Sequence, residues 1–240
     1  INAVPDTNNT TVRFIDQVAW SPITFVDVPF RGLGSGNYQP TEAGQRRFRV
    51  FTARTDTFTV AGNTVILVDT ALTFEAGKYY TLLHMGYARA GSTPRQRIVA
   101  INDVHPAAGG QVAVRAIHAA LGVGAVDIYA TPTPTSAISG TPLFRNVATE
   151  AVSAYQNVAP AAFAAQVAAA GATTSLMAAA APAGTAGTSA ADPIGGATVA
   201  GSVITAIAFP ATPANKSFGP RFTTPGIGYF IDKHPPRTVP

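Results

Sequence analysis

The sequence predicts an all-β protein made of two consecutive domains. Three observations support this: short apolar runs alternate with polar residues, turn-forming residues recur every 8–15 positions, and several short motifs occur twice in the same order. Closely spaced turns are typical of a β-sandwich or barrel, because short strands must alternate with tight reversals. The 240 residues are enough for two such domains.

In the first half, the clearest strand pattern surrounds Phe48. Phe48 and Val50 alternate with Arg47 and Arg49, so apolar and charged side chains point to opposite faces of a strand. Further short runs rich in β-branched and aromatic residues occur at 65–68, 79–83 and 98–101. We expect each of these runs to form a strand.

In the second half, residues 203–207 predict a strand that ends before Pro210. Residues 161–170 give conflicting signals, because their alanines favour a helix whereas Phe163, Ala165 and Val167 recur with a period of two. This stretch occupies the place of Phe48 in the first half. We therefore expect a strand here.

Several short motifs recur in both halves, which is typical of a duplication. The matches are Val12-Arg13-Phe14-Ile15 with Val114-Arg115-Ala116-Ile117, Val26-Asp27-Val28 with Val126-Asp127-Ile128, Phe30-Arg31 with Phe144-Arg145, Tyr38 with Tyr155, Ala76-Gly77 and Thr81 with Ala200-Gly201 and Thr205, and 103–106 with 232–235. We expect a first domain at 1–108 and a second at 109–240, joined near 106–110. The second would carry an Ala/Thr/Pro-rich insertion and an extended C-terminal tail.

One of these motifs resembles a known family. Val114-Arg115-x-x-His118-Ala119, followed by Val126-Asp127-Ile128-Tyr129, is similar to the opening signature of the bacterial domain of unknown function 4397 family. The resemblance covers residues 11–110 and 111–235. In the first half Asp16 replaces the motif's His and Pro29 its Tyr, and the second half lacks the usual Pro after His-Ala. The resemblance implies exported, envelope-associated proteins with tandem immunoglobulin-like β-sandwiches, and it implies no catalytic residues.

Composition narrows the function classes. The chain has no Cys, which excludes disulfide frameworks, thiolate metal sites and a cysteine nucleophile. Its net charge of +4 is too diffuse for nucleic-acid binding. The start at Ile1, without Met, suggests a processed protein, and we expect export to the periplasm or the cell surface. No stretch is apolar enough for a transmembrane helix, and peripheral association with a membrane stays open.

The candidate binding residues are charges inside apolar strands. One interpretation places Arg115, His118 and Asp127 together in a binding site. The interpretation that we prefer is structural: Arg13 or Arg115 forms an ion pair with Asp27 or Asp127 in its own domain. An unpaired buried charge would be costly.

The histidines do not predict a metal site. His84, His105, His118 and His234 are far apart in the sequence, whereas a metal needs three or four converging ligands. The pairs Asp103/His105 and Asp232/His234 each offer two ligands just before a proline. We expect a turn there, with Asp accepting backbone hydrogen bonds. We therefore expect neither a metal nor an organic cofactor.

Signatures of catalysis are absent as well. Gly32 to Gly36 is followed by no helix that could cradle a phosphate, and Glu42, Glu75 and Glu150 lack the spacing of a glycosidase pair. We expect no catalytic residues and no enzymatic activity.

A basic cluster comprises Arg46, Arg47, Arg49 and Arg54. One interpretation is that this cluster faces an acidic partner or anionic lipid headgroups. The interpretation that we prefer is a strand face exposed to solvent.

The function that we expect is that of a non-catalytic accessory subunit, which binds a larger envelope or membrane-associated assembly through protein–protein contacts. An energy-transducing membrane complex is one example of such an assembly. A subunit of an extracellular filament or surface layer is an alternative. Another is an adhesive or glycan-binding module, which would gather Trp20, Tyr38 or Tyr129 at one end of a sandwich.

Charge distribution suggests where a partner would bind. The first 110 residues carry 18 charged side chains and the remaining 130 carry 10, with Asp192 alone between 151 and 200. A large face with little charge usually meets another molecule. We therefore expect contacts at 171–198 and 211–226.

Overall fold

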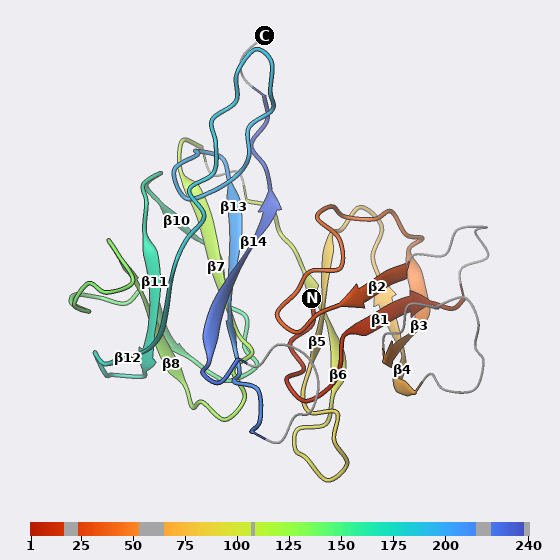
Figure 1. The fold of residues 1–240 in the computed structure, drawn as a ribbon. Coiled ribbons are helices and arrows are strands. Elements are labelled where there is room, and N and C mark those ends of the chain that lie inside the picture. Colours follow the sequence, from red (N-terminus) through yellow and green to blue (C-terminus); the bar gives the residue numbers. More distant parts are fainter. Residues whose placement is uncertain (17–23, 53–64, 107–108, 215–221, 238–240) are drawn as a thin grey trace. The chain divides into compact units, whose positions relative to one another are not determined.

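The computed structural model describes residues 1–16, 24–52, 65–106, 109–214 and 222–237 (Figure 1). These residues form fourteen strands and no helix, so the all-β prediction is confirmed. Accordingly, none of them belongs to a helix of the length and hydropathy that a membrane crossing needs. The chain divides into two compact units. Unit 1 comprises Ile1–Val104 with Thr212–Arg221, and unit 2 comprises His105–Ala211 with Phe222–Pro240.

The predicted boundary at 108 stays a prediction, because residues 107–108 lie outside the described part of the chain. The immunoglobulin-like topology also stays a prediction.

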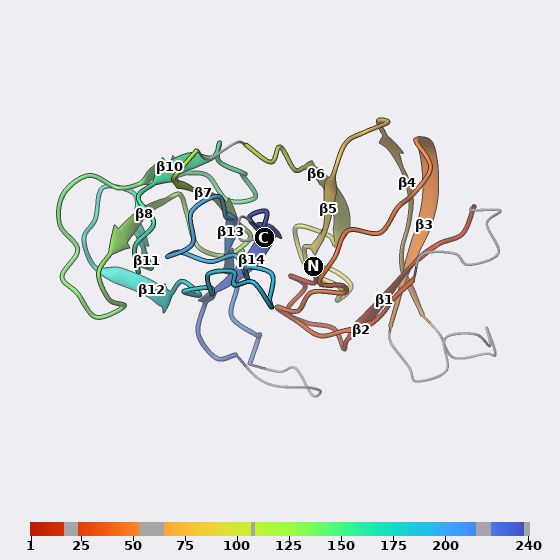
Figure 2. The ribbon, with the colours of Figure 1, turned by 90° about the horizontal axis from the view of Figure 1, so that it is seen from above.

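Unit 1 is a two-layered sandwich. Its strands are β1 (Thr10–Phe14), β2 (Thr24–Val28), β3 (Gly44–Thr52), β4 (Ile66–Phe74), β5 (Tyr80–Met85) and β6 (Arg97–Asn102). Strands β2-β1-β3-β4 form one sheet, and β5-β6 form the second layer (Figure 2). Phe14 and Phe48 of the first sheet pack in one apolar cluster with Ile98 of β6. The predicted alternation is confirmed, because Phe48 and Val50 are buried while Arg47 is exposed.

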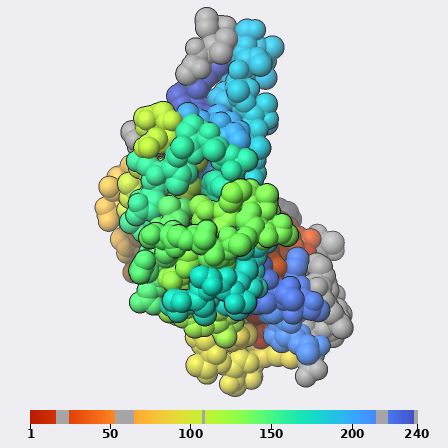
Figure 3. Space-filling model, turned by 90° about the vertical axis from the view of Figure 1, so that its left-hand side faces the viewer, coloured from red at the N-terminus to blue at the C-terminus, as the bar shows by residue number. Residues whose placement is uncertain are grey.

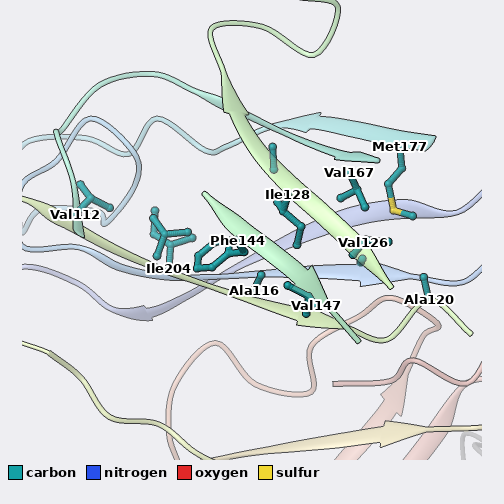
Figure 4. Packing of buried hydrophobic residues seen from close by; sticks show 13 residues of the cluster. Val112, Ala116, Ala120, Val126, Ile128, Phe144, Val147, Val167, Met177 and Ile204 are labelled. Carbon is teal, nitrogen blue, oxygen red and sulfur yellow. The ribbon is translucent and has the colours of Figure 1, made fainter. Parts of the chain in front are cut away.

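Unit 2 is a larger sandwich of two four-stranded sheets. Its strands are β7 (Val112–His118), β8 (Val126–Thr131), β9 (Phe144–Val147), β10 (Gln156–Val158), β11 (Ala164–Ala169), β12 (Ser175–Ala180), β13 (Val203–Phe209) and β14 (Gly226–Lys233). The sheet orders are β10-β7-β13-β14 and β12-β11-β8-β9. Side chains of both sheets, such as Ile204 and Ile128, meet in the apolar cluster of Figure 4. The expected strands at 203–207 and 161–170 are thus confirmed.

Strand β11 shows how packing overrides helix propensity. It pairs with β8 on one side and with β12 on the other, so its backbone groups are satisfied by neighbouring strands. Its alternate residues Ala165 and Val167 belong to the core cluster. A helix over this alanine-rich stretch would give up both ladders.

In both units the strands of the first sheet pair in the same order. The correspondence between the strands of the two units, however, differs from the alignment that the sequence predicted. The order β2-β1-β3-β4 of unit 1 corresponds to β9-β8-β11-β12 of unit 2. Val12 pairs with Val50, and Ile128 pairs with Val167 in the corresponding place. Strand β1 therefore corresponds to β8. The predicted match of Val12-Arg13 with Val114-Arg115 is wrong, because the latter residues lie in β7.

The structural counterpart of His118-Ala119 is Asn2-Ala3. Asn2 forms a parallel bridge with His84 of β5, as His118 pairs in parallel with Ala208 of β13. The Ala3 N–H donates to the His84 carbonyl at 2.7 Å, and the Ala119 N–H donates to the Ala208 carbonyl at 2.9 Å. Asp16 and Pro29 are therefore not the first-half counterparts of the motif's His and Tyr.

The backbone conformation of β2 and β9, and of the residues that follow them, supports the same correspondence between the two units. Asp27 and Arg31 have positive φ in unit 1, as Asn146 and Glu150 do in unit 2. The Arg31 N–H donates to the Asn2 carbonyl, and the Glu150 N–H to the His118 carbonyl. The predicted matches of Asp27 with Asp127 and of Arg31 with Arg145 are therefore also wrong.

The Ala/Thr/Pro-rich insertion that we expected in the second domain contains part of the sandwich. Strand β12 (Ser175–Ala180) pairs with β11 and completes its sheet. Only after it does the chain leave the sheet, in a hairpin formed by residues 182–198, which we call the arm. Thr185 and Ile194 exchange two backbone hydrogen bonds of 2.9 Å at its centre. The arm is the cyan loop that projects beyond β13 and β14 in Figure 1.

Candidate functional site

A buried polar cluster joins β7, β13 and β14 in unit 2. Asp232 Oδ2 accepts hydrogen bonds from the Tyr155 hydroxyl at 2.8 Å and from the Thr205 hydroxyl at 2.5 Å. Arg115 Nε donates to Thr205 Oγ1 at 2.7 Å, and Arg115 Nη2 lies 3.7 Å from the same carboxylate oxygen. The Arg115 and Asp232 side chains are only 2% and 5% exposed. The cluster is an ion pair that holds three strands together.

Unit 1 contains the same arrangement around Asp103. Asp103 Oδ2 accepts hydrogen bonds from the Tyr38 hydroxyl at 2.8 Å and the Thr81 hydroxyl at 2.7 Å. The three residues are the predicted counterparts of Tyr155, Thr205 and Asp232. At these positions the predicted alignment therefore agrees with the structure.

The expected role of these aspartates needs correction. We predicted a turn in which Asp103 and Asp232 accept backbone hydrogen bonds, but Asp232 lies in β14, and both carboxylates accept hydrogen bonds from tyrosine and threonine hydroxyls that are distant in the sequence. Each aspartate fastens the last strand of its unit to the strand beside it. No group of three or more His, Asp or Glu side chains that could hold a metal ion occurs within the described ranges.

Arg115, His118 and Asp127 have separate partners. Arg115 pairs with Asp232 rather than with Asp127, so the preferred interpretation identified an ion pair but the wrong carboxylate. Asp127 accepts the backbone N–H of Asn146 at 2.6 Å and that of Gly171 at 2.9 Å. These two hydrogen bonds lower the pKa of Asp127 below its ordinary value.

The buried histidines also bind within their own units. His118 Nε2 donates to the Gly124 carbonyl at 2.9 Å, and burial lowers the pKa of His118. His84 Nε2 donates to Gln96 Oε1 at 3.0 Å, and burial lowers the pKa of His84 to about 4. His234 Nδ1 accepts the backbone N–H of Gly195 at 2.8 Å, which attaches the arm to the C-terminal segment. At neutral pH His84 and His118 are therefore uncharged structural groups.

The basic cluster on β3 is largely paired with acidic groups. Arg47 and Arg49 each place Nε 2.8 Å from a carboxylate oxygen of Asp69, and they lower the pKa of Asp69 to about 2. Arg46 forms an ion pair of 3.1 Å with Glu42. Arg54 lies outside the described residues. This pairing supports the solvated strand face that we preferred.

The aromatic residues of the adhesive alternative do not share one environment. Tyr129 is 5% exposed within β8, so its ring is not available to stack on a ligand. Tyr38 is 37% exposed, and its hydroxyl binds Asp103. Trp20 lies outside the described part of the chain.

Sequence reasoning missed two buried polar residues that connect loops and sheets. Gln166 of β11 donates from Nε2 to the Ser136 carbonyl at 2.6 Å, and its signal was an isolated amide in an alanine-rich strand. The Tyr229 hydroxyl of β14 donates to the Ala179 carbonyl at 2.8 Å and accepts the Ala165 N–H at 3.0 Å. Burial raises the pKa of Tyr229 to about 12. This hydroxyl links the two sheets of unit 2.

Comparison with known proteins gives a family. No curated protein matches the chain. A family model described as domain of unknown function (DUF4397) matches residues 1–129. The matched range includes the six strands of unit 1, all of β7, and β8 up to Tyr129. It thus contains the Val114–Tyr129 motif on which the resemblance rested, and it exceeds half of the 240 residues. The chain belongs to the family of the domain of unknown function DUF4397.

Proposed function

We propose that this protein is a non-catalytic structural subunit, exported to the periplasm or the cell surface, which binds protein partners of a larger assembly through unit 2. The observation that carries the proposal is the arm, a projecting and almost uncharged hairpin that is ordered by its own hydrogen bonds. Figure 3 shows the arm standing out from the surface of unit 2.

The arm is organised before any partner binds. The Thr188 hydroxyl accepts the N–H groups of Ala190 and Ala191 at 3.2 and 3.1 Å, which closes the tip of the hairpin. Arg237 donates to the Ser189 carbonyl and so ties the tip to the C-terminal segment. A segment that is already ordered loses less conformational entropy when it binds.

The surface of the arm suits a protein contact. The Ile194 side chain is 56% exposed, and Asp192 is the single charge of the arm. Exposed apolar groups in a weakly charged surface are typical of contact sites.

Strand β12 adds a second weakly charged surface. It is the edge strand of its sheet, its residues Ser175–Ala180 carry no charge, and Leu176 is 45% exposed. Natural proteins usually protect such edges with Lys or Pro against pairing with other chains. An unprotected edge supports contact with a partner.

The buried polar groups support a structural rather than a catalytic role. Arg115, Asp127 and Gln166 each bind atoms of neighbouring strands or loops. Their hydrogen bonds fix the sandwich, which is a sufficient reason for burying them.

The test is a shortened arm. Replacing 186–193 by a two-residue turn removes the tip and leaves β12 and β13 intact, whereas deleting 174–192 would remove β12. We expect the shortened protein to keep its melting temperature and to lose co-purification with its assembly from native envelopes. A matched control deletes the exposed loop residues 139–141 of the same unit and should co-purify normally. Co-purification of the shortened-arm variant at the wild-type level would contradict the proposal, and the Arg46–Arg49 face would become the better candidate.

A further inference from the structure

Strand β12 differs from the other edge strands of unit 2 and of the large sheet of unit 1. It pairs with β11 on one side, and it is the last described strand of its sheet on the other (Figure 2). The other edge strands of the three four-stranded sheets are β2, β4, β9, β10 and β14, and all of them except β10 contain Asp, Arg or Lys. Strand β10 has only three residues, and Pro160 follows two positions later. Among these six edges, β12 is therefore the one that is both uncharged and longer than three residues.

The hydrogen bonds of β12 show which of its backbone groups face the open side. The Ala181 N–H donates to the Phe163 carbonyl, on the side of β11, at 2.9 Å. In an antiparallel ladder the peptide groups of successive residues point alternately to one neighbour and to the other. The N–H and carbonyl groups of Ala178 and Ala180 therefore point away from β11. They are the groups that a further strand would bind.

The side chains on this edge permit close approach of another strand. Ala178 and Ala180 lie on the same face of β12, because they are two positions apart. A second backbone can approach them without meeting a long side chain. Leu176, beside the bulge in the pairing with β11, is 45% exposed and adds an apolar group next to the two alanines.

The absence of charge favours a second copy of this chain as the occupant. In a twofold contact, the same patch of both copies meets itself, so that a charge near the axis lies close to a like charge. Contacts between different proteins instead use opposite charges to select the partner. No charged residue lies between Glu150 and Asp192 in the sequence, and this segment contains all of β12. Pairing of β12 with its own copy therefore brings no like charges of this segment together.

We propose that two copies of the protein pair through β12, in antiparallel orientation around a twofold axis at Ala178. In this register Ala178 lies opposite its own copy, and Leu176 of one copy lies opposite Ala180 of the other. A large side chain thus meets a small one on both sides of the axis. The inference rests on the proposed function, which already uses the β12 surface for a protein contact, and it names the partner at that surface.

Opposite charges at Ala178 test both the partner and the position of the axis. Ala178→Lys and Ala178→Glu each place two like charges directly opposite one another, so neither variant alone should form a dimer. An equimolar mixture of the two should form one, because Lys then faces Glu. The control substitutions are Thr73→Lys and Thr73→Glu, at an exposed residue of the edge strand β4, and they should leave the dimer unchanged.

Sedimentation velocity over a range of protein concentrations measures the dimer. Strand β12 contributes six residues per copy, which is a small contact. We therefore expect a weak wild-type dimer, with a Kd of about 10–100 μM. Wild-type protein that stays monomeric well above this range would overturn the proposal. A dimer that Ala178→Lys and Ala178→Glu leave intact would place the contact elsewhere and would overturn it too.

Cross-linking decides the question if the charged variants fold poorly. The natural chain has no Cys, so each cysteine variant carries a single thiol. Ala178→Cys should form disulfide-linked dimers at least about tenfold faster than Leu176→Cys, because pairing brings only the former two thiols together. The two Leu176 positions lie about 13 Å apart along the paired strands. Each rate is divided by the rate at which the same thiol reacts with a small maleimide, which corrects for exposure. Equal corrected rates would overturn the proposal.

The arm and the β12 edge can be tested separately. The shortened-arm variant keeps β12, so we expect it to form dimers as the wild type does, whatever its co-purification shows. A wild type that dimerises while the shortened arm still co-purifies would contradict the role of the arm and support pairing through β12. A monomeric wild type whose Ala178→Lys variant fails to co-purify would assign the edge to a different protein and overturn the second copy as its occupant.

Discussion

Thr205 donates a hydrogen bond of 2.5 Å to Asp232, and the same hydroxyl accepts a hydrogen bond from Arg115. The threonine thus connects the two charges of a buried ion pair. In unit 1 Thr81 donates to Asp103 in the corresponding place. Buried ion pairs of this kind are tolerated when all the hydrogen-bonding groups around them are satisfied.

Removal of Asp232 should therefore strongly destabilise unit 2. Asp232→Ala leaves the buried Arg115 without its carboxylate, which costs about 3–5 kcal/mol of unfolding free energy in comparable cases. Thr205→Val should cost less, about 1–3 kcal/mol, because it removes hydrogen bonds without removing a charge. Urea unfolding of the full chain measures both changes. Arg237→Ala, at an exposed ion pair, is the control, and equal effects of Asp232→Ala and Arg237→Ala would contradict the structural role.

Tyr229→Phe should loosen the contact between the sheets of unit 2. The variant keeps the ring but leaves the Ala165 N–H and the Ala179 carbonyl without the hydroxyl that binds both. We expect a loss of about 1–3 kcal/mol, and faster hydrogen exchange of the Ala165 amide. Tyr79→Phe, at a half-exposed ring, is the matched control. Unchanged exchange at Ala165 in Tyr229→Phe would show that the hydroxyl contributes nothing to this contact.

Acid should destabilise unit 1 through His84. Burial lowers the pKa of His84 from 6.5 to about 4, so the unfolded chain binds more protons than the folded chain between these pH values. The stability that neutral His84 contributes is complete above pH 6.5 and is lost as the pH falls to about 4.

Melting temperatures measured from about pH 4 to above pH 6.5 test this expectation. His84→Gln keeps a polar side chain without a titrating ring, so its melting temperature should fall less steeply on acidification. Identical slopes in both proteins would assign the pH dependence to other groups.

Gly196→Ala should disturb the arm without unfolding the sandwich. A Cβ at this position would collide with the backbone of Ala183 and Gly184, which the hairpin brings against it. We expect co-purification with the assembly to fall while the cooperative unfolding of unit 2 persists. Gly124→Ala is the control, because its Cβ would meet open space. An arm variant that binds normally despite altered amide exchange at Thr185 would argue against the arm as the contact.

The sequence by itself determined the strand around Phe48 and which Tyr, Thr and Asp residues correspond to one another in the two units. Alternation around Phe48 predicted β3 because burial of one face requires a period of two. The repeated Tyr, Thr and Asp residues predicted which positions correspond late in each unit. Thr81 and Thr205 lie in β5 and β13, and corresponding strands follow one another in the same order along the chain in both units.

Tertiary structure alone decided the partner of Arg115 and the register of the first strands. Arg115 and its hydrogen-bond partner Thr205 are 90 residues apart and meet because β7 and β13 pair in parallel. No local pattern encodes which distant strand becomes a neighbour. Val12-Arg13 and Val114-Arg115 are similar in sequence because both belong to buried strands, yet β1 and β7 lie in different layers of their sandwiches. Hydrophobic periodicity shows that a residue faces a core, and only the packing of the whole chain determines what it meets there.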